Sequence, residues 1–165
     1  MDQQIYILIV EDELEVMDAL VNDLEFFEQT FPIESANTAE EANLVIDHIS
    51  DEGNAVGLIL CDHVLPGQNG VDLLVELQNK NGISMSRKVL VTGQAGLDDT
   101  IIAINKADLN HYIAKPWTRE QLHKVVVDEL TKYVIQRKLN PLPYMSTLDA
   151  NRLSDIIREN PLTDH

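Results

Sequence analysis

The most informative stretch of the sequence is Leu58-Ile59-Leu60-Cys61-Asp62-His63-Val64-Leu65-Pro66-Gly67-Gln68-Asn69-Gly70. Its apolar run stops at Asp62, and a Pro-Gly pair, which favours a turn, follows soon afterwards. A short apolar run with such boundaries is typical of a strand that is buried on both faces of a parallel sheet. Ligands of α/β proteins bind outside the carboxyl ends of such strands. We therefore expect Asp62 to lie at the functional edge of an α/β fold.

Other short apolar segments have the same strand character, and segments with helical spacing of apolar residues separate them. The expected strands are residues 5–10, 33–36, 56–61, 88–91 and 111–114. The expected helices begin near residues 13, 38, 70, 98 and 118, the first continues through Phe27, and the last runs to about Lys138. Capping boxes are expected at Thr38 with Glu41 and at Thr118 with Gln121.

Strict alternation of strands and helices predicts a doubly wound five-stranded parallel sheet, (βα)5, with helices on both faces. We expect the flavodoxin-like strand order 2-1-3-4-5, which belongs to this class and places strands one and three side by side. Polar residues then meet at one edge of the sheet, because each follows a strand. These residues are Glu11 and Asp12 after the first strand, Asp62 after the third, Thr92 after the fourth and Lys115 after the fifth.

The chemistry of this set points to a cation and a phosphoryl group. Two carboxylates ~5 Å apart repel by roughly 3 kcal/mol at an effective dielectric constant of ~20. Three acids in one pocket therefore need a cation or a raised pKa, and Mg²⁺ prefers such hard oxygen ligands. The ammonium of Lys115 and the hydroxyl of Thr92 suit phosphoryl oxygens. Asp62 would then be a carboxylate nucleophile that forms an aspartyl phosphate.

The motifs Glu11-Asp12, Asp62-x-x-x-Pro66-Gly67-x-x-Gly70, Thr92-Gly93 and Tyr112-x-x-Lys115-Pro116 closely resemble the receiver domain of two-component response regulators, in its chemotaxis-regulator-like form. The resemblance covers residues 5–138, nearly the whole chain apart from its last residues. It implies a Mg²⁺ site made by Glu11, Asp12, Asp62 and the backbone carbonyl of Val64.

The same resemblance implies a role for each remaining residue of the site. Asp62 would accept the phosphoryl group from a histidine kinase or a phosphotransfer protein. Lys115 would contact a phosphoryl oxygen, Thr92 would move toward it, and the ring of Tyr112 would follow Thr92. The face of the fourth helix, fifth strand and fifth helix would then bind a downstream protein or a second copy of the chain.

Two alternatives stay open at this point. The chain could be the regulatory part of a larger signalling enzyme, or a Mg²⁺-dependent phosphatase that turns over through an aspartyl phosphate. The phosphatase would need a second acid near the nucleophile, and Val64 stands two residues after Asp62. We therefore expect a signalling protein that is not an enzyme.

Composition limits the other classes of function. The net charge of −16 argues against a nucleic-acid partner. The single cysteine, the absence of a basic signal region and the short first apolar run predict a cytoplasmic protein without membrane partners. The five histidines lack metal-ligand spacing, and we expect His63 at the rim of the pocket. Residues 1–138 are expected to form the receiver domain, and residues 139–165 a tail that holds one short helix or a loosely docked terminus.

Overall fold

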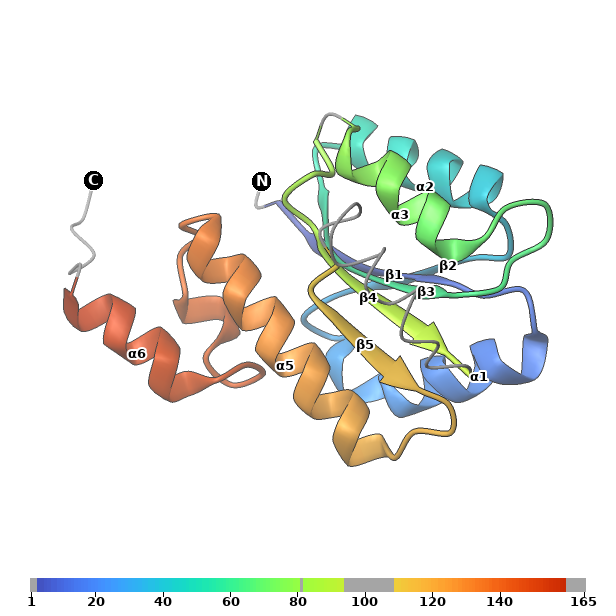
Figure 1. Ribbon diagram of the computed structural model, residues 1–165. Helices are drawn as coiled ribbons and strands as arrows, with labels where there is room; N and C mark the ends of the chain where they lie inside the picture. The colour runs from blue at the N-terminus through green and yellow to red at the C-terminus, as the bar shows by residue number, and fades with distance from the viewer. Residues whose placement is uncertain (1–2, 81, 94–108, 160–165) are drawn as a thin grey trace.

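The computed structural model describes residues 3–80, 82–93 and 109–159 of the 165. Its centre is a five-stranded parallel sheet with the order β2-β1-β3-β4-β5, which confirms the predicted fold class (Figure 1). The strands are β1 (Ile5–Val10), β2 (Ile33–Ala36), β3 (Ala55–Asp62), β4 (Arg87–Thr92) and β5 (His111–Ala114). The expected strands agree with these bounds to within one residue.

Helices cover both faces of the sheet (Figure 1). They are α1 (Leu14–Asp23), α2 (Ala39–Asp51), α3 (Gly70–Gln78), α5 (Arg119–Gln136) and α6 (Ala150–Glu159), with short 3₁₀ turns at Glu25–Phe27 and Leu142–Tyr144. The helix expected at residues 98–107 lies outside the described residues. None of the helices in the described ranges is long and apolar enough to cross a membrane.

Side-chain alternation along the strands divides the core into two layers. Ile7 and Ile9 of β1 join the cluster that contains the apolar residues of α1 and α5, whereas Leu8 and Val10 join the cluster with α2 and α3. All four side chains are fully buried. Successive residues of a strand point to opposite faces, so a continuous apolar run is the pattern that a doubly covered strand requires.

Two details of the helices differ from the sequence-based expectations. The first helix ends at Asp23, and Phe27 lies in the 3₁₀ turn that follows. Between them the backbone N–H of Leu24 donates to the carbonyls of both Leu20 and Val21, so the chain tightens at this point. The capping box at Thr118 and Gln121 is complete, because the side chain of each residue accepts a hydrogen bond from the backbone N–H of the other. At Thr38 the N–H of Glu41 donates to the threonine hydroxyl oxygen, but the described residues show no return bond from the Thr38 N–H to the Glu41 side chain.

The segment after α5 folds back against the domain. Leu148 and Leu153 are buried in the same core cluster as α1 and α5. The ring of Phe31 stacks on Tyr144 at 5.4 Å between centroids, and the hydroxyls of Thr30 and Thr147 are hydrogen-bonded at 2.8 Å. These contacts attach the C-terminal segment to the loop before β2 as well as to α5.

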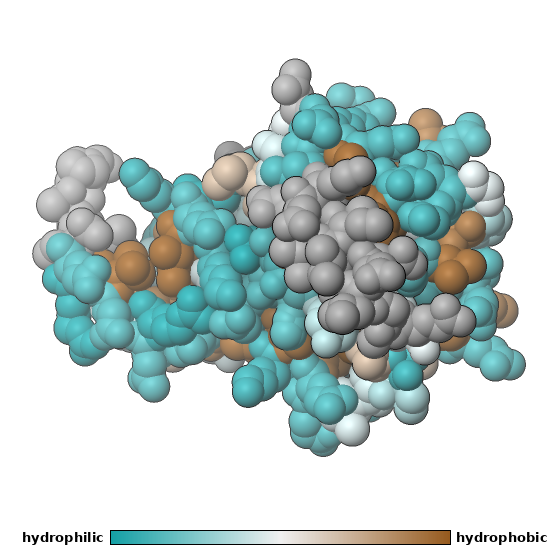
Figure 2. Space-filling view, in the orientation of Figure 1, coloured by the Kyte–Doolittle hydropathy of each residue, from teal (hydrophilic) through white to brown (hydrophobic). Residues whose placement is uncertain are grey.

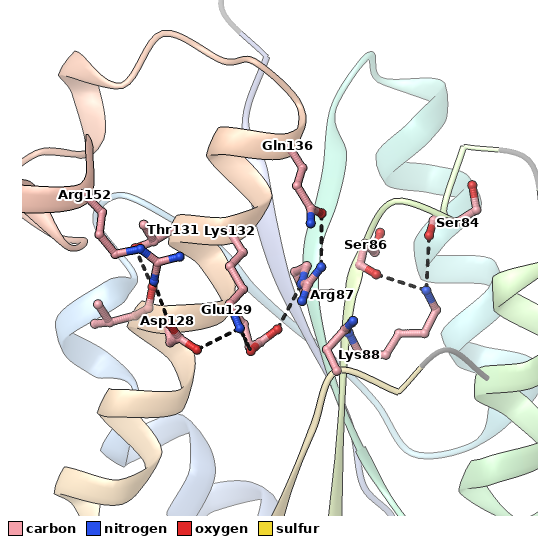
Figure 3. Close-up of polar contacts among 12 residues, drawn as sticks. Ser84, Ser86, Arg87, Lys88, Asp128, Glu129, Thr131, Lys132, Gln136 and Arg152 are labelled. Carbon is pink, nitrogen blue, oxygen red and sulfur yellow. Dashed lines mark hydrogen bonds and ion pairs between the residues drawn. The ribbon is translucent and has the colours of Figure 1, made fainter. Parts of the chain in front are cut away.

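Charged side chains connect α6, α5 and β4 (Figure 3). Arg152 of α6 bonds Asp128 at 2.7 Å, and Lys132 bridges Asp128 and Glu129 at 3.1 and 3.5 Å. The carboxylate of Glu129 is 1% exposed and accepts a hydrogen bond from Arg87 at 2.9 Å. Because the buried carboxylate has two cationic partners, its burial carries no unpaired charge.

Candidate phosphoryl-acceptor site

The acids of β1 and β3 meet because the two strands are neighbours in register. Val10 pairs with Cys61, so Glu11 and Asp62 follow side by side at the carboxyl edge of the sheet. One ligand oxygen from each of Glu11, Asp12 and Asp62 lies within 4.8 Å of the others. Glu11 is fully buried, Asp62 is 4% exposed, and Asp12 is exposed. The structure therefore brings together the three carboxylates that the sequence suggested as metal ligands.

Lys115 supplies a positive charge to this cluster from the end of β5. Its Nζ atom lies 2.7 Å from Asp62 Oδ1 and 3.3 Å from Glu11 Oε1. Its backbone N–H donates to the carbonyl of Thr92 at 2.8 Å, which fixes the residue beside the end of β4. Burial alone would lower the pKa of the Lys115 ammonium, but the hydrogen bond and charge of Asp62, followed by Glu11, raise it above its usual value.

The pKa of Glu11 shows that its negative charge is unfavourable in this buried position. Burial raises the pKa of its carboxyl above the usual value, and the charge of Asp62 raises it further. The N–H of Glu13, which donates to Glu11 Oε2 at 3.0 Å, and the ammonium of Lys115 lower it only in part. Three hard oxygen donors close together, one with a proton held more tightly than usual, are the donor set that a divalent cation stabilises.

The pocket beside the cluster has a volume of about 480 Å³. Besides Asp62 and Lys115, its lining contains Glu13, His63, Val64, Asn69, Thr92 and Gly93. Val64, the expected backbone ligand, has a side chain that is 72% exposed. Tyr112 lies on β5, three residues before Lys115, and is 45% exposed. Of the predicted site residues, Asp62, Val64, Thr92 and Lys115 line this pocket, whereas Tyr112 lines a different cavity, between β5 and α5.

Gly70 brings α3 close to the strand that carries Asp62. Its N–H donates to the carbonyl of His63 at 2.8 Å. A Cβ atom at this position would lie 2.0 Å from the carbonyl oxygen of Asp62, a distance that no side chain tolerates. The glycine in the Asp62-to-Gly70 spacing therefore permits a close approach of two backbones.

His63 differs from the expectation. Its side chain is only 9% exposed and lines the pocket, rather than lying at an open rim. Its Nδ1 atom is 3.1 Å from the hydroxyl of Thr92, which is 1% exposed. Sequence reasoning missed this contact, because no local pattern links a residue after one strand to a residue at the end of the next.

The site is thus a carboxylate triad with one lysine, at the carboxyl edge of a parallel sheet in the order 2-1-3-4-5. Residues 7–127 match the model of the response regulator receiver domain family. The chain belongs to this family, whose members act in two-component signalling.

Individual relatives agree with this assignment. The chain is 30% identical over 121 residues to the hydrogenase transcriptional regulatory protein HoxA of Cupriavidus necator, an alignment that covers 73% of this chain and 23% of that protein. It is 28% identical to the transcriptional regulatory protein CitT of Halalkalibacterium halodurans over 81% of this chain and 54% of that protein. The chain therefore spans only part of the length of these curated relatives.

A solved structure with similar sequence shows the same fold. The CheY-like response regulator receiver domain protein of Methanospirillum hungatei is 28% identical and superposes with a TM-score of 0.68. The match covers 82% of this chain and 99% of that one. The family match ends at residue 127, so the second half of α5 and all of α6 lie beyond it.

Proposed function

We propose that this protein accepts a phosphoryl group on Asp62 from a histidine kinase or a phosphotransfer protein and thereby changes its protein contacts. The observation that carries the proposal is the contact of Lys115 with Asp62 at 2.7 Å within a cluster of three carboxylates. A nearly buried aspartate with a lysine on one oxygen has its other oxygen available as a nucleophile.

Glu11, Asp12 and Asp62, with the backbone carbonyl of Val64, would hold Mg²⁺. The ion would supply positive charge beside the transferring phosphoryl oxygens. Asp62 attacks phosphorus, the new O–P bond forms, and the P–N bond to the donor imidazole breaks. The ammonium of Lys115 neutralises charge on a phosphoryl oxygen, and the hydroxyl of Thr92 donates a hydrogen bond to another.

The response would be a shift between two arrangements of the same fold. In this proposal Thr92 and Tyr112 transmit the change, and the face that includes β5 and α5 binds a downstream protein or a second copy. The partial exposure of Tyr112 on β5 supports a role at a contact surface. Residues 1–138 would form the switching domain and residues 139–165 an appended segment. The phosphorylation is stoichiometric and involves no catalytic turnover.

Incubation with Mg²⁺ and acetyl phosphate, followed by intact-protein mass spectrometry, tests the proposal. The wild type should gain one phosphoryl group, and Asp62→Asn should gain none. Asp72→Asn is a matched control, because Asp72 is an exposed acid in the first turn of α3 and is absent from the pocket lining. Labelling that survives in Asp62→Asn would contradict the assignment of the acceptor.

A further inference from the structure

His63 is held in place by its backbone on two sides. Its N–H donates to the carbonyl of Val91 on β4 at 2.9 Å, and its carbonyl accepts the N–H of Gly70 at the start of α3 at 2.8 Å. The residue therefore continues the pairing of β3 with β4 for one more position beyond Asp62. A side chain on such a fixed backbone, with 9% of its surface exposed, has few alternative positions.

The side chains of His63 and Thr92 lie together on the side of the sheet opposite to that of Asp62. Val91 pairs with Asp62 and joins the core cluster of α1 and α5, whereas Leu90 joins the cluster of α2 and α3. Thr92 follows Val91, and His63 follows Asp62, so alternation turns both side chains toward the α3 side. Their hydrogen bond at 3.1 Å agrees with this placement.

We infer that His63 is a positioning residue for the switch: its imidazole holds the Thr92 hydroxyl in the resting state and must release it when Asp62 is phosphorylated. The inference rests on the proposed function. In the proposed resting state the imidazole carries its hydrogen on Nε2, so Nδ1 accepts the hydrogen bond from the Thr92 hydroxyl. The hydroxyl has a single hydrogen to donate and phosphoryl oxygens only accept, so it cannot donate to both partners at once. To bond a phosphoryl group on Asp62, the Thr92 hydroxyl has to turn from the α3 side toward the edge of the sheet, and the contact with Nδ1 is lost.

The bond to His63 therefore favours the resting arrangement over the phosphorylated one. A ligand shifts a two-state equilibrium only by its difference in affinity for the two states, and the same holds for an internal contact. The net contribution of one ordinary hydrogen bond corresponds to about a 2- to 10-fold change in an equilibrium constant. Removing the imidazole should thus strengthen binding of a phosphoryl group or its mimic by that factor.

The test compares the Mg²⁺-dependent affinity for beryllofluoride, a phosphoryl mimic, among variants at His63 and Thr92. His63→Leu keeps similar volume but removes the hydrogen-bonding atom, and it should bind beryllofluoride about 2- to 10-fold more tightly than the wild type. His63→Asn places a polar atom near the position of Nδ1, and its affinity for beryllofluoride should therefore be much closer to that of the wild type. In the Thr92→Val background, His63→Leu should have no further effect, because the coupled partner is gone.

Three results would overturn the inference. In the first, His63→Leu binds beryllofluoride with the same affinity as the wild type. In the second, His63→Leu and His63→Asn change this affinity equally, which indicates that the imidazole acts through packing. In the third, the effect of His63→Leu persists in the Thr92→Val background. In each of these cases the wild type still binds beryllofluoride, and the proposed function stands. A wild type that neither binds beryllofluoride nor gains a phosphoryl group would overturn the proposed function and the inference together.

Discussion

Replacing Lys115 by methionine should destabilise the metal-free protein at neutral pH. The Lys115 ammonium contacts Asp62 and Glu11 at 2.7 and 3.3 Å. Both carboxylates are nearly inaccessible to water, with exposed fractions of 4% and 0%. Methionine keeps the aliphatic stem and removes only the charge, so the carboxylates lose their shared cation without a large cavity forming.

The magnitude follows from the separation of the two carboxylates. Their oxygens lie within 4.8 Å of one another, and Coulomb repulsion at an effective dielectric constant of ~20 then amounts to about 3 kcal/mol. Removing one partner of a buried ion pair costs ~3–5 kcal/mol, and the 21% exposure of Lys115 places this pair at the lower end of that range. We expect a loss of about 3 kcal/mol in the free energy of unfolding.

The loss should shrink toward acidic pH. The pKa of Glu11 in the folded protein is raised above its ordinary value of 4.5, mainly by burial. The folded state therefore binds a proton where the unfolded state does not, and stability falls as pH rises from about 4.5 through the folded pKa. Without the lysine this pKa rises further, so a proton can replace the missing cation over a wider pH range.

Urea unfolding followed by circular dichroism, in EDTA and in Mg²⁺, measures the effect. Lys80→Met is the matched control, because Lys80 pairs with a 59% exposed Asp47 at 2.8 Å and should cost less than about 1 kcal/mol. Mg²⁺ should restore more stability to Lys115→Met than it adds to the wild type, because it binds the same carboxylates. Equal losses in the two lysine variants, or no recovery with Mg²⁺, would refute this account of the cluster.

Two further substitutions test the packing around the site and the C-terminal segment. Gly70→Ala should cost roughly 3 kcal/mol or more in unfolding free energy, because its Cβ would lie 2.0 Å from the carbonyl oxygen of Asp62. A Cβ atom at Gly93 would have no neighbour closer than 4.0 Å, so Gly93→Ala should leave the unfolding free energy nearly unchanged. Equal losses in the two glycine variants would contradict the explanation. Leu153→Ala should cost about 2–4 kcal/mol, because the side chain is fully buried. Ile157 of the same helix is only half-buried. If Leu153→Ala loses no more unfolding free energy than Ile157→Ala, α6 is only loosely attached.

The strands and the members of the site could be predicted because their signals are local. Ile5–Val10 and His111–Ala114 have the expected bounds, since each apolar run ends at a charged or polar residue. Acids and a lysine directly after strands identify the carboxyl edge without knowledge of distances. The strand order itself came from the fold class, and the structure confirms it.

What could not be predicted depends on contacts between distant segments. The bond between His63 and Thr92 requires the register of β3 against β4, which no spacing within either strand reveals. The end of α1 at Asp23 was missed, because Phe27 keeps helical spacing while the backbone tightens into a 3₁₀ turn. Apolar residues at helical spacing show that a face is buried, but not which surface receives it.

The C-terminal segment limits how α5 can contribute to a dimer. The end of this helix and the turn after it carry the apolar residues Tyr133, Val134, Ile135 and Leu139, which are candidates for a contact between two copies. Tyr133 and Val134 are each only 1% exposed, so the folded chain itself already covers them. What remains is a groove of about 400 Å³ between α5 and α6, where Figure 2 shows hydrophobic side chains at the surface. A dimer through the end of α5 would therefore have to use this groove, with Ile135 and Leu139 in its wall, or displace α6 and lose the burial of Leu153. The first route leaves the domain intact, whereas the second loses the burial of the whole Leu153 side chain together with the other contacts of α6, such as that of Arg152 with Asp128.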